Sequence, residues 1–428
     1  MSTTPVSHEP AAQWREAVRQ LAAMERPSAS AGEHRAAELI AERLRALGCR
    51  ARVEEEEAHG GYWWPISLPN AAAAGAGLLA AARRRRPATR ALLAAVAAGC
   101  GWVIWDDLGH GARWFRRRLL PTRSTWNVVG ETGDPDAAQT VALIAHHDAA
   151  HSGLVFHPAL GRVGPAIAPG VHARSSHTFP ILYAVWAGPV IVAAGSLLGI
   201  RGVVRAGIVL SLGAVAAMAD IGRARVVPGA NDNLTAVGAV LAVAEALREQ
   251  PLAHLRVLLL STGSEESFSE GMQGFARRHF PHMDRRSTEF LCLECLGSET
   301  LSVLEGEGML KMRDYPRHMR DALADAATRA GVRIARGVRT VAATDALVAL
   351  RAGYPVATLV SVEPTKLPRN YHWPSDTPDG LRWRTVEDAI ATCESFLRVR
   401  AGEAALRCRA GQAAPANDGT ASGSSSRS

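Results

Sequence analysis

Short apolar runs of strand length alternate with longer segments of helical periodicity along most of the chain. Four runs are rich in Val, Ile and Leu: TVALIAHHD, LRVLLLST, FLCLECLG and PVATLVSV. Helical patterns at 233–250, near 270–279 and at 315–330 separate these runs, and a closing helix starts near residue 385. This alternation predicts an α/β fold, with a mixed, mainly parallel sheet sandwiched by helices.

The N-terminal region is predicted to belong to the same domain. Residues 11–48 have helical periodicity, most clearly in GEHRAAELIAERLRALG, which ends at a glycine as helices often do. A short strand, CRARVEEEE, is expected to follow. We therefore assign residues 11–64, 120–154 and 226–408 to one α/β domain. Residues 409–428, rich in Ala, Gly and Ser, are expected to form a disordered tail.

Two pairs of uncharged segments interrupt this domain. The first pair is 65–82 and 91–105, and the second is 178–200 and 206–222. We expect two inserted hydrophobic helical hairpins, within 65–110 and 155–225. They could be buried helices of a soluble core, but segment 178–200 has the length and polarity of a membrane span. Nearby tryptophans and flanking arginines resemble interfacial anchors and favour membrane lipid as a partner.

Charge and cysteine content narrow the functional classes. The net charge of +7 comes almost entirely from arginine, which is spread along the chain without a recognised binding motif, so nucleic-acid binding is not expected. Six cysteines in 428 residues do not suggest a disulfide framework, and Cys292 and Cys295 are interpreted as small apolar core residues. The N-terminus lacks the pattern of a secretory signal, which favours a membrane-associated protein with a cytoplasmic catalytic part. Arginines flank both ends of the hairpins, so they leave the topology open.

Titratable residues gather at or near the ends of the predicted strands. Each of them has an ordinary structural explanation when taken alone, such as a helix cap or a solvated turn. Together, two histidines and several carboxylates that converge from successive strand ends are what a pair of divalent metal ions requires. The candidates are His146, Asp148, Asp232, Glu265, Glu266, Glu294 and His372.

The motifs follow one another as H-x-D at 146–148, G-A-N-D-N around Asp232, Glu265-Glu266, an acid in the next strand and a late histidine. This order of motifs resembles peptidase family M28. The segment RPSASAGEHRAAELI also resembles the family's opening. The resemblance implies a zinc-exopeptidase-like fold and two Zn²⁺ ions per chain. It also implies ligand roles: His146, Asp232 and Glu266 for one ion, and Asp232, Glu294 and His372 for the other.

The remaining site residues have supporting roles. The resemblance implies that Glu265 is the general base. Strand alternation points His146 and Asp148 to one side and His147 to the other, so Asp148 can accept the free ring N–H of His146 or of a neighbouring ligand. Asp376 could orient His372 or simply form a turn. His151 could line the pocket, but a loop histidine is more often solvated. Tyr371 could donate to a developing oxyanion, but a packing role is favoured.

Two departures from the family pattern stand out. Glu294 occupies a position where the family often has aspartate, and its longer side chain could shift the second ion. An extra segment with the second hairpin separates His146 from Asp232. The expected activity is hydrolysis of peptide bonds, as an aminopeptidase or other exopeptidase. The alternatives are a glutaminyl-cyclase-like enzyme with one zinc, and an inactive membrane receptor or scaffold on the same fold.

Overall fold

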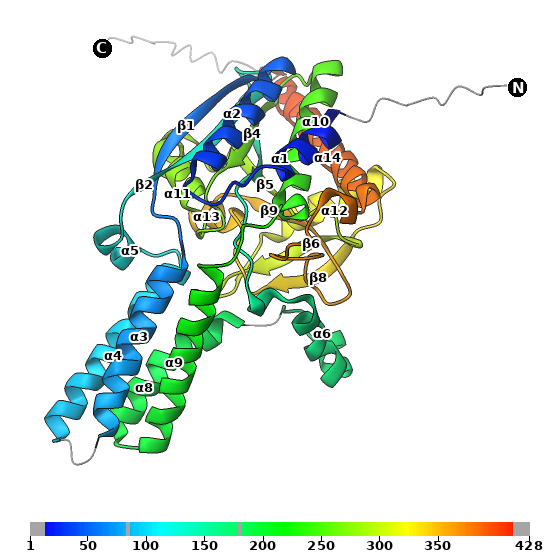
Figure 1. The fold of residues 1–428 in the computed structure, drawn as a ribbon. Coiled ribbons are helices and arrows are strands. Elements are labelled where there is room, and N and C mark those ends of the chain that lie inside the picture. Colours follow the sequence, from blue (N-terminus) through cyan, green and yellow to red (C-terminus); the bar gives the residue numbers. More distant parts are fainter. Residues whose placement is uncertain (1–12, 83–85, 179–180, 414–428) are drawn as a thin grey trace, which may run out of the picture.

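A computed structural model describes residues 13–82, 86–178 and 181–413 of the chain (Figure 1). An α/β domain carries a bundle of four long helices that projects from one side. This arrangement confirms the predicted fold class, including the apolar helical hairpins. Residues 414–428 of the predicted tail lie outside the described residues.

The centre of the domain is one mixed sheet. Its strands, in chain order, are β1 (Arg50–Ala58), β2 (Arg123–Gly133), β3 (Thr140–His146), β4 (Arg256–Thr262), β5 (Thr288–Glu294), β6 (Thr300–Glu307), β7 (Arg313–Asp314), β8 (Ala335–Thr340) and β9 (Val356–Val362). Their spatial order is β1-β2-β4-β3-β5-β9-β6-β7, with β8 paired to β6. The central strands β4, β3, β5 and β9 are parallel, and antiparallel pairs flank them on both sides.

Helices cover both faces of the sheet, because the parallel central strands are apolar on both faces. On one face lie α1 (Gln13–Ala22), α2 (Ala31–Ala46), α10 (Thr235–Glu249), α12 (Arg317–Arg329) and α14 (Trp383–Ala413). On the other lie α11 (Glu270–His279) and α13 (Ala346–Arg351). Short 3₁₀ turns are η1 (Leu154–Phe156), η3 (Phe280–His282) and η4 (Pro378–Gly380), and η2 (Ala230–Leu234) is a distorted turn before α10.

One predicted boundary is wrong. The tail was expected from residue 409, but α14 continues to Ala413. The sequence RCRAGQA contains Arg, Ala and Gln, which favour helix and extend one that is already packed on the sheet.

The four apolar segments form a bundle of two helical hairpins. Its helices are α3 (Trp63–Ala81), α4 (Pro87–Leu108), α8 (Ile181–Leu198) and α9 (Arg201–Ile221). They touch through glycines: a Cβ on Gly77 would lie 2.7 Å from Ile208, and one on Gly207 would lie 2.6 Å from the Val192 amide nitrogen. Such close contact through small residues is typical of helices that pack in a membrane.

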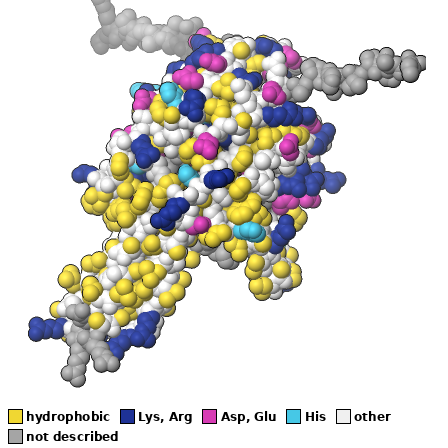
Figure 2. Space-filling view, in the orientation of Figure 1, with side chains coloured by type: hydrophobic (Ala, Val, Ile, Leu, Met, Phe, Trp, Pro, Cys, Tyr) yellow, Lys and Arg dark blue, Asp and Glu magenta, His cyan; other side chains and the backbone are white. Residues whose placement is uncertain are grey.

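The outside of the bundle is apolar. Among the described residues, α4 and α9 are long and apolar enough to cross a membrane, and α8 contains a shorter apolar helix, Leu182–Leu198. Hydrophobic side chains cover the visible face of the bundle, and arginines gather at its far end (Figure 2). The exposed tryptophans Trp64, Trp102 and Trp105 lie at the opposite end, where α3 begins and α4 ends beside the α/β domain.

Two connecting segments complete the chain. Helix α5 (Trp114–Leu119) follows the first hairpin and leads into β2. Helices α6 (Pro158–Ile167) and α7 (Pro169–Arg174) lie between β3 and the second hairpin and protrude beside the bundle (Figure 1). Both connections leave the α/β domain near the carboxyl ends of the central strands, where the titratable residues gather.

Candidate metal centre

The predicted site residues meet at the carboxyl edge of the parallel strands. His146 is the last residue of β3 and Glu294 the last of β5, and the loop with Glu265 and Glu266 follows β4. Asp232 lies in η2, and His372 lies in the loop after β9. Because parallel strands end at one edge, residues far apart in sequence are brought together there.

Asp232 lies between the two histidines. Its Oδ1 is 3.3 Å from His146 Nε2, and its Oδ2 is 3.2 Å from His372 Nε2. All three side chains are almost completely buried. Each oxygen of one carboxylate therefore faces a different imidazole, which is the arrangement expected of a ligand that bridges two ions.

The three glutamates surround this group. Glu265 Oε2 and Glu294 Oε1 lie 3.7 and 3.5 Å from His146 Nε2, and Glu266 Oε2 lies 3.1 Å from His372 Nε2. Donor atoms of His146, Asp232 and Glu266 lie within 4.8 Å of one another, and those of Asp232, Glu294 and Cys295 form a second such group. The structure thus brings all five predicted ligands and the predicted base into one cluster.

The division of the ligands between two ions stays a prediction. The first group of donor atoms matches the triad expected for one ion. In the other expected triad, however, Glu294 contacts His146, while His372 contacts Glu266. The longer side chain of Glu294 gives it this reach towards His146.

The cluster carries an excess of buried negative charge. Burial opposes protonation of both histidines, but neighbouring carboxylates outweigh it and raise the pKa of His146 well above its usual range and that of His372 to about 10. Burial and carboxylate repulsion also raise the pKa values of Glu265, Glu266 and Glu294. Several carboxylates buried together require compensating cations.

The donor set fits divalent zinc. Imidazole nitrogen and carboxylate oxygen are common zinc ligands. Asp232 Oδ2 and Glu266 Oε1 are buried and accept no hydrogen bond within the described part of the chain. Buried carboxylate oxygens without hydrogen-bond donors are available to coordinate a metal ion.

Asp148 holds both a predicted ligand and the predicted base in position. Its Oδ1 lies 3.3 Å from His146 Nδ1 and accepts a hydrogen bond of 3.0 Å from the Glu265 amide. Its Oδ2 accepts hydrogen bonds from the Glu266 amide at 3.1 Å and from Ser28 Oγ at 2.6 Å. Asp148 therefore orients His146 and the Glu265-Glu266 loop at the same time.

Replacing Asp148 by asparagine is expected to weaken zinc affinity by about 10–100-fold, the usual loss when a partner of a metal-binding histidine is removed. An amide oxygen replaces only one of the two carboxylate acceptors. Competition with a chromophoric chelator measures the affinity. Ser28→Ala removes a single hydrogen bond to the same carboxylate and should reduce zinc affinity less. Equal zinc affinities in the wild type and the two variants would contradict this role for Asp148.

Sequence reasoning named Asp376 with another role, as an orienter of His372 or a turn residue, and it missed Asn233. Asp376 accepts hydrogen bonds from the amides of Asn231 and Asp232 at 2.8 and 3.1 Å, so it holds the backbone of Asp232, and no contact with His372 is seen among the described residues. Asn233 donates to Glu294 Oε2 at 3.2 Å and accepts from the Cys295 amide at 2.9 Å. The G-A-N-D-N motif was a usable signal for Asn233.

Arg26 joins two of the loops that carry ligands. Its buried guanidinium donates to the carbonyl oxygens of His147, Pro228 and Gly229 at 2.7–2.9 Å. These contacts link the end of β3 to the segment that leads to Asp232. Only its place in the RPSASAGEHRAAELI segment pointed to Arg26.

The segment that follows the first hairpin holds the loop after β4. Ser264, Phe268 and Ser269 have φ values of 50–70°, in the left-handed region that disfavours these residue types. Arg116 donates to the Ser267 carbonyl at 2.7 Å, and Arg113 donates to that of Phe268. The segment after the hairpin thus supports a strained loop that carries Glu265 and Glu266.

Arg116 also joins two buried carboxylates. It makes paired hydrogen bonds of 2.8–2.9 Å with Asp107 at the end of α4, and its Nη1 lies 3.2 Å from Glu270 at the start of α11. All three side chains are buried. Arg116 is therefore the central cation of a buried network between the first hairpin and the catalytic loop.

Aromatic residues wall the cluster. The Tyr371 ring stacks on that of His372 at 3.9 Å between centroids, and the Phe156 ring packs edge-on against His372 at 4.5 Å. His151, for which solvation was favoured over a place in the pocket, is half-buried, contacts the Ala224 carbonyl and Trp63, and lines a small cavity beside Glu266. This cavity places the start of α3 next to a predicted ligand.

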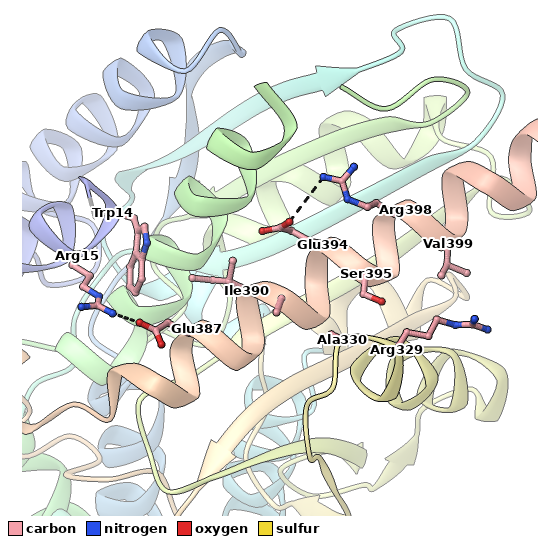
Figure 3. A pocket seen from close by; sticks show the side chains of 11 residues that line it. Trp14, Arg15, Arg329, Ala330, Glu387, Ile390, Glu394, Ser395, Arg398 and Val399 are labelled. Carbon is pink, nitrogen blue, oxygen red and sulfur yellow. Dashed lines mark hydrogen bonds and ion pairs between the residues drawn. The ribbon is translucent and has the colours of Figure 1, made fainter. Parts of the chain in front are cut away.

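Another groove on the described part of the molecule lies away from this cluster. It runs between α1, α12 and α14 and is lined by residues such as Trp14, Arg329 and Arg398 (Figure 3). None of the residues that line it belongs to the cluster. The chemistry therefore points to the carboxyl edge of the sheet and not to this groove.

Comparisons with known proteins agree with this geometry. The model of peptidase family M28 matches residues 214–397, which include five of the six clustered residues. A Zn-dependent exopeptidase from Parabacteroides distasonis has 13% identity and a TM-score of 0.51, with 90% of this chain and 96% of that chain covered. A glutaminyl cyclase from Tannerella forsythia has 12% identity and a TM-score of 0.52, with 90% and 97% covered.

At these identities the two structures share the fold with this chain and establish nothing more. No curated protein sequence matches the chain. The family match, the mixed sheet and its strand-end cluster are mutually consistent, and residues 214–397 of the chain match the model of peptidase family M28.

Proposed function

We propose that this protein is a zinc-dependent exopeptidase, most simply an aminopeptidase, that hydrolyses peptide bonds at a centre of two zinc ions. The observation that carries this proposal is the position of the Asp232 carboxylate between His146 and His372, with one oxygen facing each. A single zinc would leave one of these buried imidazoles among carboxylates without a metal. The donor set therefore favours two ions.

The residues divide the work of hydrolysis. His146, Asp232, Glu266, Glu294 and His372 would hold the zinc ions, which when bound lower the pKa of a water molecule and polarise the scissile carbonyl. Glu265 would accept the proton of that water and return it to the departing amine. Burial raises the pKa of Glu265, which suits a group that must hold a proton between these two steps. Asp148 keeps the backbone of Glu265 in place.

Two alternatives make different predictions. A glutaminyl-cyclase-like enzyme on this fold would use one zinc, and one structure of similar fold is a glutaminyl cyclase. An inactive receptor or scaffold would need no metal. The presence of all predicted ligands in one buried cluster favours an active enzyme over the second alternative.

Zinc titration of the chelator-treated protein is expected to show two ions bound per chain and to restore hydrolysis of aminoacyl or N-acyl dipeptide substrates. His146→Ala should lower the stoichiometry to one, whereas His282→Ala, at an exposed histidine outside the cluster, should leave it at two. One ion in the wild type with cyclisation of N-terminal glutamine would establish the cyclase alternative. No zinc uptake would establish the scaffold.

The same titration is expected to release protons at pH 7, because zinc binds neutral imidazole and ionised carboxylate, and the metal-free cluster raises the pKa values of its histidines and glutamates. The pKa of His372, about 10, keeps that imidazole protonated at pH 7 without metal, and the pKa of His146 is raised as well. Zinc affinity should therefore increase as the pH rises from 6 towards 9. Calorimetry in buffers of different ionisation enthalpy measures the protons released, and a heat independent of the buffer would contradict the expectation.

We further propose that the four-helix bundle is embedded in a membrane. At 1.5 Å per residue, the 22 residues of α4 span about 33 Å, close to the thickness of the hydrocarbon core. Glycine contacts inside the bundle and apolar side chains outside it support this placement. The tryptophans at its base would lie at the interface nearer the α/β domain.

A further inference from the structure

Helices α6 and α7 carry apolar side chains that are largely exposed in the described structure. Neither helix buries a residue. Leu160, Val163 and Ile167 lie on one face of α6, with Ile167 79% exposed, and Val171 on α7 is 63% exposed. A contiguous apolar surface of this kind marks an interaction site.

The charge of the surrounding segment indicates what this face binds. The chain contains no aspartate or glutamate between Asp148 and Asp220, although it has 41 acidic residues overall. Arg162 and Arg174 on these helices are exposed. An apolar helix face with only basic charges beside it is typical of helices that lie on an anionic lipid surface.

The position of α6 and α7 in the molecule is consistent with binding to a lipid surface. Helix α6 projects from the same side of the α/β domain as the four-helix bundle, and hydrophobic side chains cover the protrusion (Figures 1 and 2). The exposed tryptophans at the base of the bundle lie at its domain end, the end from which α6 also emerges.

We propose that α6 and α7 lie in the interface of an anionic phospholipid bilayer, with Leu160, Val163, Ile167 and Val171 among the acyl chains and Arg162 and Arg174 near the headgroups. This inference rests on the proposed membrane placement of the bundle and goes beyond it. It adds a second membrane contact that lies on the surface and does not span.

This contact would be coupled to the metal centre. The Phe156 ring, two residues before α6, packs against His372. At the other end, His172 Nε2 lies 3.0 Å from the Pro364 carbonyl, and Lys366 donates to the carbonyl oxygens of His172 and Ser175. The segment thus contacts the loop that carries His372 at two places. Docking on the bilayer would hold this side of the centre at the membrane surface, within reach of peptides that are bound there.

The test uses the full chain in lipid nanodiscs, with Cys100 and Cys408 replaced by serine and one fluorophore-labelled cysteine introduced at a time. Probes at 160 and 167, which point in nearly the same direction, report the apolar face, and a probe at 166 is the matched control, because Ala166 is exposed on the same helix but about 100–120° away from both. Lipids brominated along the acyl chains quench probes that enter the bilayer.

We expect quenching at 160 and 167 that exceeds quenching at 166 at least twofold, and that is stronger with phosphatidylglycerol than with phosphatidylcholine alone. Equal, weak quenching at all three positions would overturn the inference. Probes at 160 and 167 that are shielded without lipid quenching and become exposed on dilution would also overturn it, because that result identifies a second copy of the chain as the occupant.

A probe at Val209, exposed on the outside of α9, separates this inference from the proposal on which it rests. Quenching at 209 without quenching at 160 and 167 would overturn the α6–α7 inference and retain the embedded bundle. Absence of quenching at 209 would overturn the bundle placement itself.

Discussion

Replacing Glu265 by glutamine is expected to lower kcat by about 10²–10⁴-fold while the protein keeps its bound zinc. Glutamine has nearly the same shape and leaves the hydrogen bond from its backbone amide to Asp148 intact. It cannot accept the proton of the attacking water. Steady-state kinetics, with zinc measured on the same sample by elemental analysis, test this expectation.

Glu266→Gln is the matched comparison, because it makes the same chemical change at the next residue. Glu266 lies 3.1 Å from His372 and is a predicted ligand, so this variant should lose zinc affinity and recover part of its activity at high zinc concentration. Glu265→Gln should show no such recovery. Near-normal turnover of zinc-loaded Glu265→Gln would exclude Glu265 as the base.

Replacing Arg116 by methionine is expected to have the largest effect on stability, lowering the free energy of unfolding by about 3–5 kcal/mol. Arg116 is completely buried, and its removal leaves Asp107 and Glu270 without their shared cation. It also removes the hydrogen bond to the Ser267 carbonyl in the loop that carries Glu265 and Glu266. Denaturant unfolding in detergent measures the stability, and kcat measured below the unfolding transition reports the loop.

Arg117→Met is the control, because Arg117 is exposed on the same short helix and should change stability by at most about 0.5 kcal/mol. Arg116→Lys keeps a charge but loses the paired hydrogen bonds with Asp107. Its loss of stability should therefore lie between those of Arg117→Met and Arg116→Met. A variant Arg116→Met with unchanged stability and kcat would show that the first hairpin does not support the catalytic loop.

The central strands and most helices were predictable because their hydrophobic patterns are local. The run LRVLLLST became β4 (Arg256–Thr262), and PVATLVSV became β9 (Val356–Val362). Strands β2, β6 and β8 were not predicted, because sequences such as RSTWNVVGETG and ARGVRT mix polar and apolar residues. They form strands because neighbouring strands supply hydrogen bonds, a tertiary effect that propensity does not report.

The candidate site likewise has features that the sequence indicates and features that only the fold shows. The predicted ligands could be proposed from the sequence, because histidines and acids at the ends of apolar strands are rare enough to mark a site as a set. The roles of the supporting residues could not. Asp376, Arg26 and Arg116 act on backbone groups that only folding brings near them.

The sequence by itself determined the α/β class, the apolar hairpins and the chemical types gathered at the strand ends, because each of these depends on residues close together along the chain. Tertiary structure alone decided that Glu294 reaches His146, that Asp376 holds the Asp232 backbone and that Arg116 links the first hairpin to the catalytic loop. The physical reason is distance. Charge pairs and hydrogen bonds act over a few ångströms in space, and a linear pattern does not record which distant residues come that close.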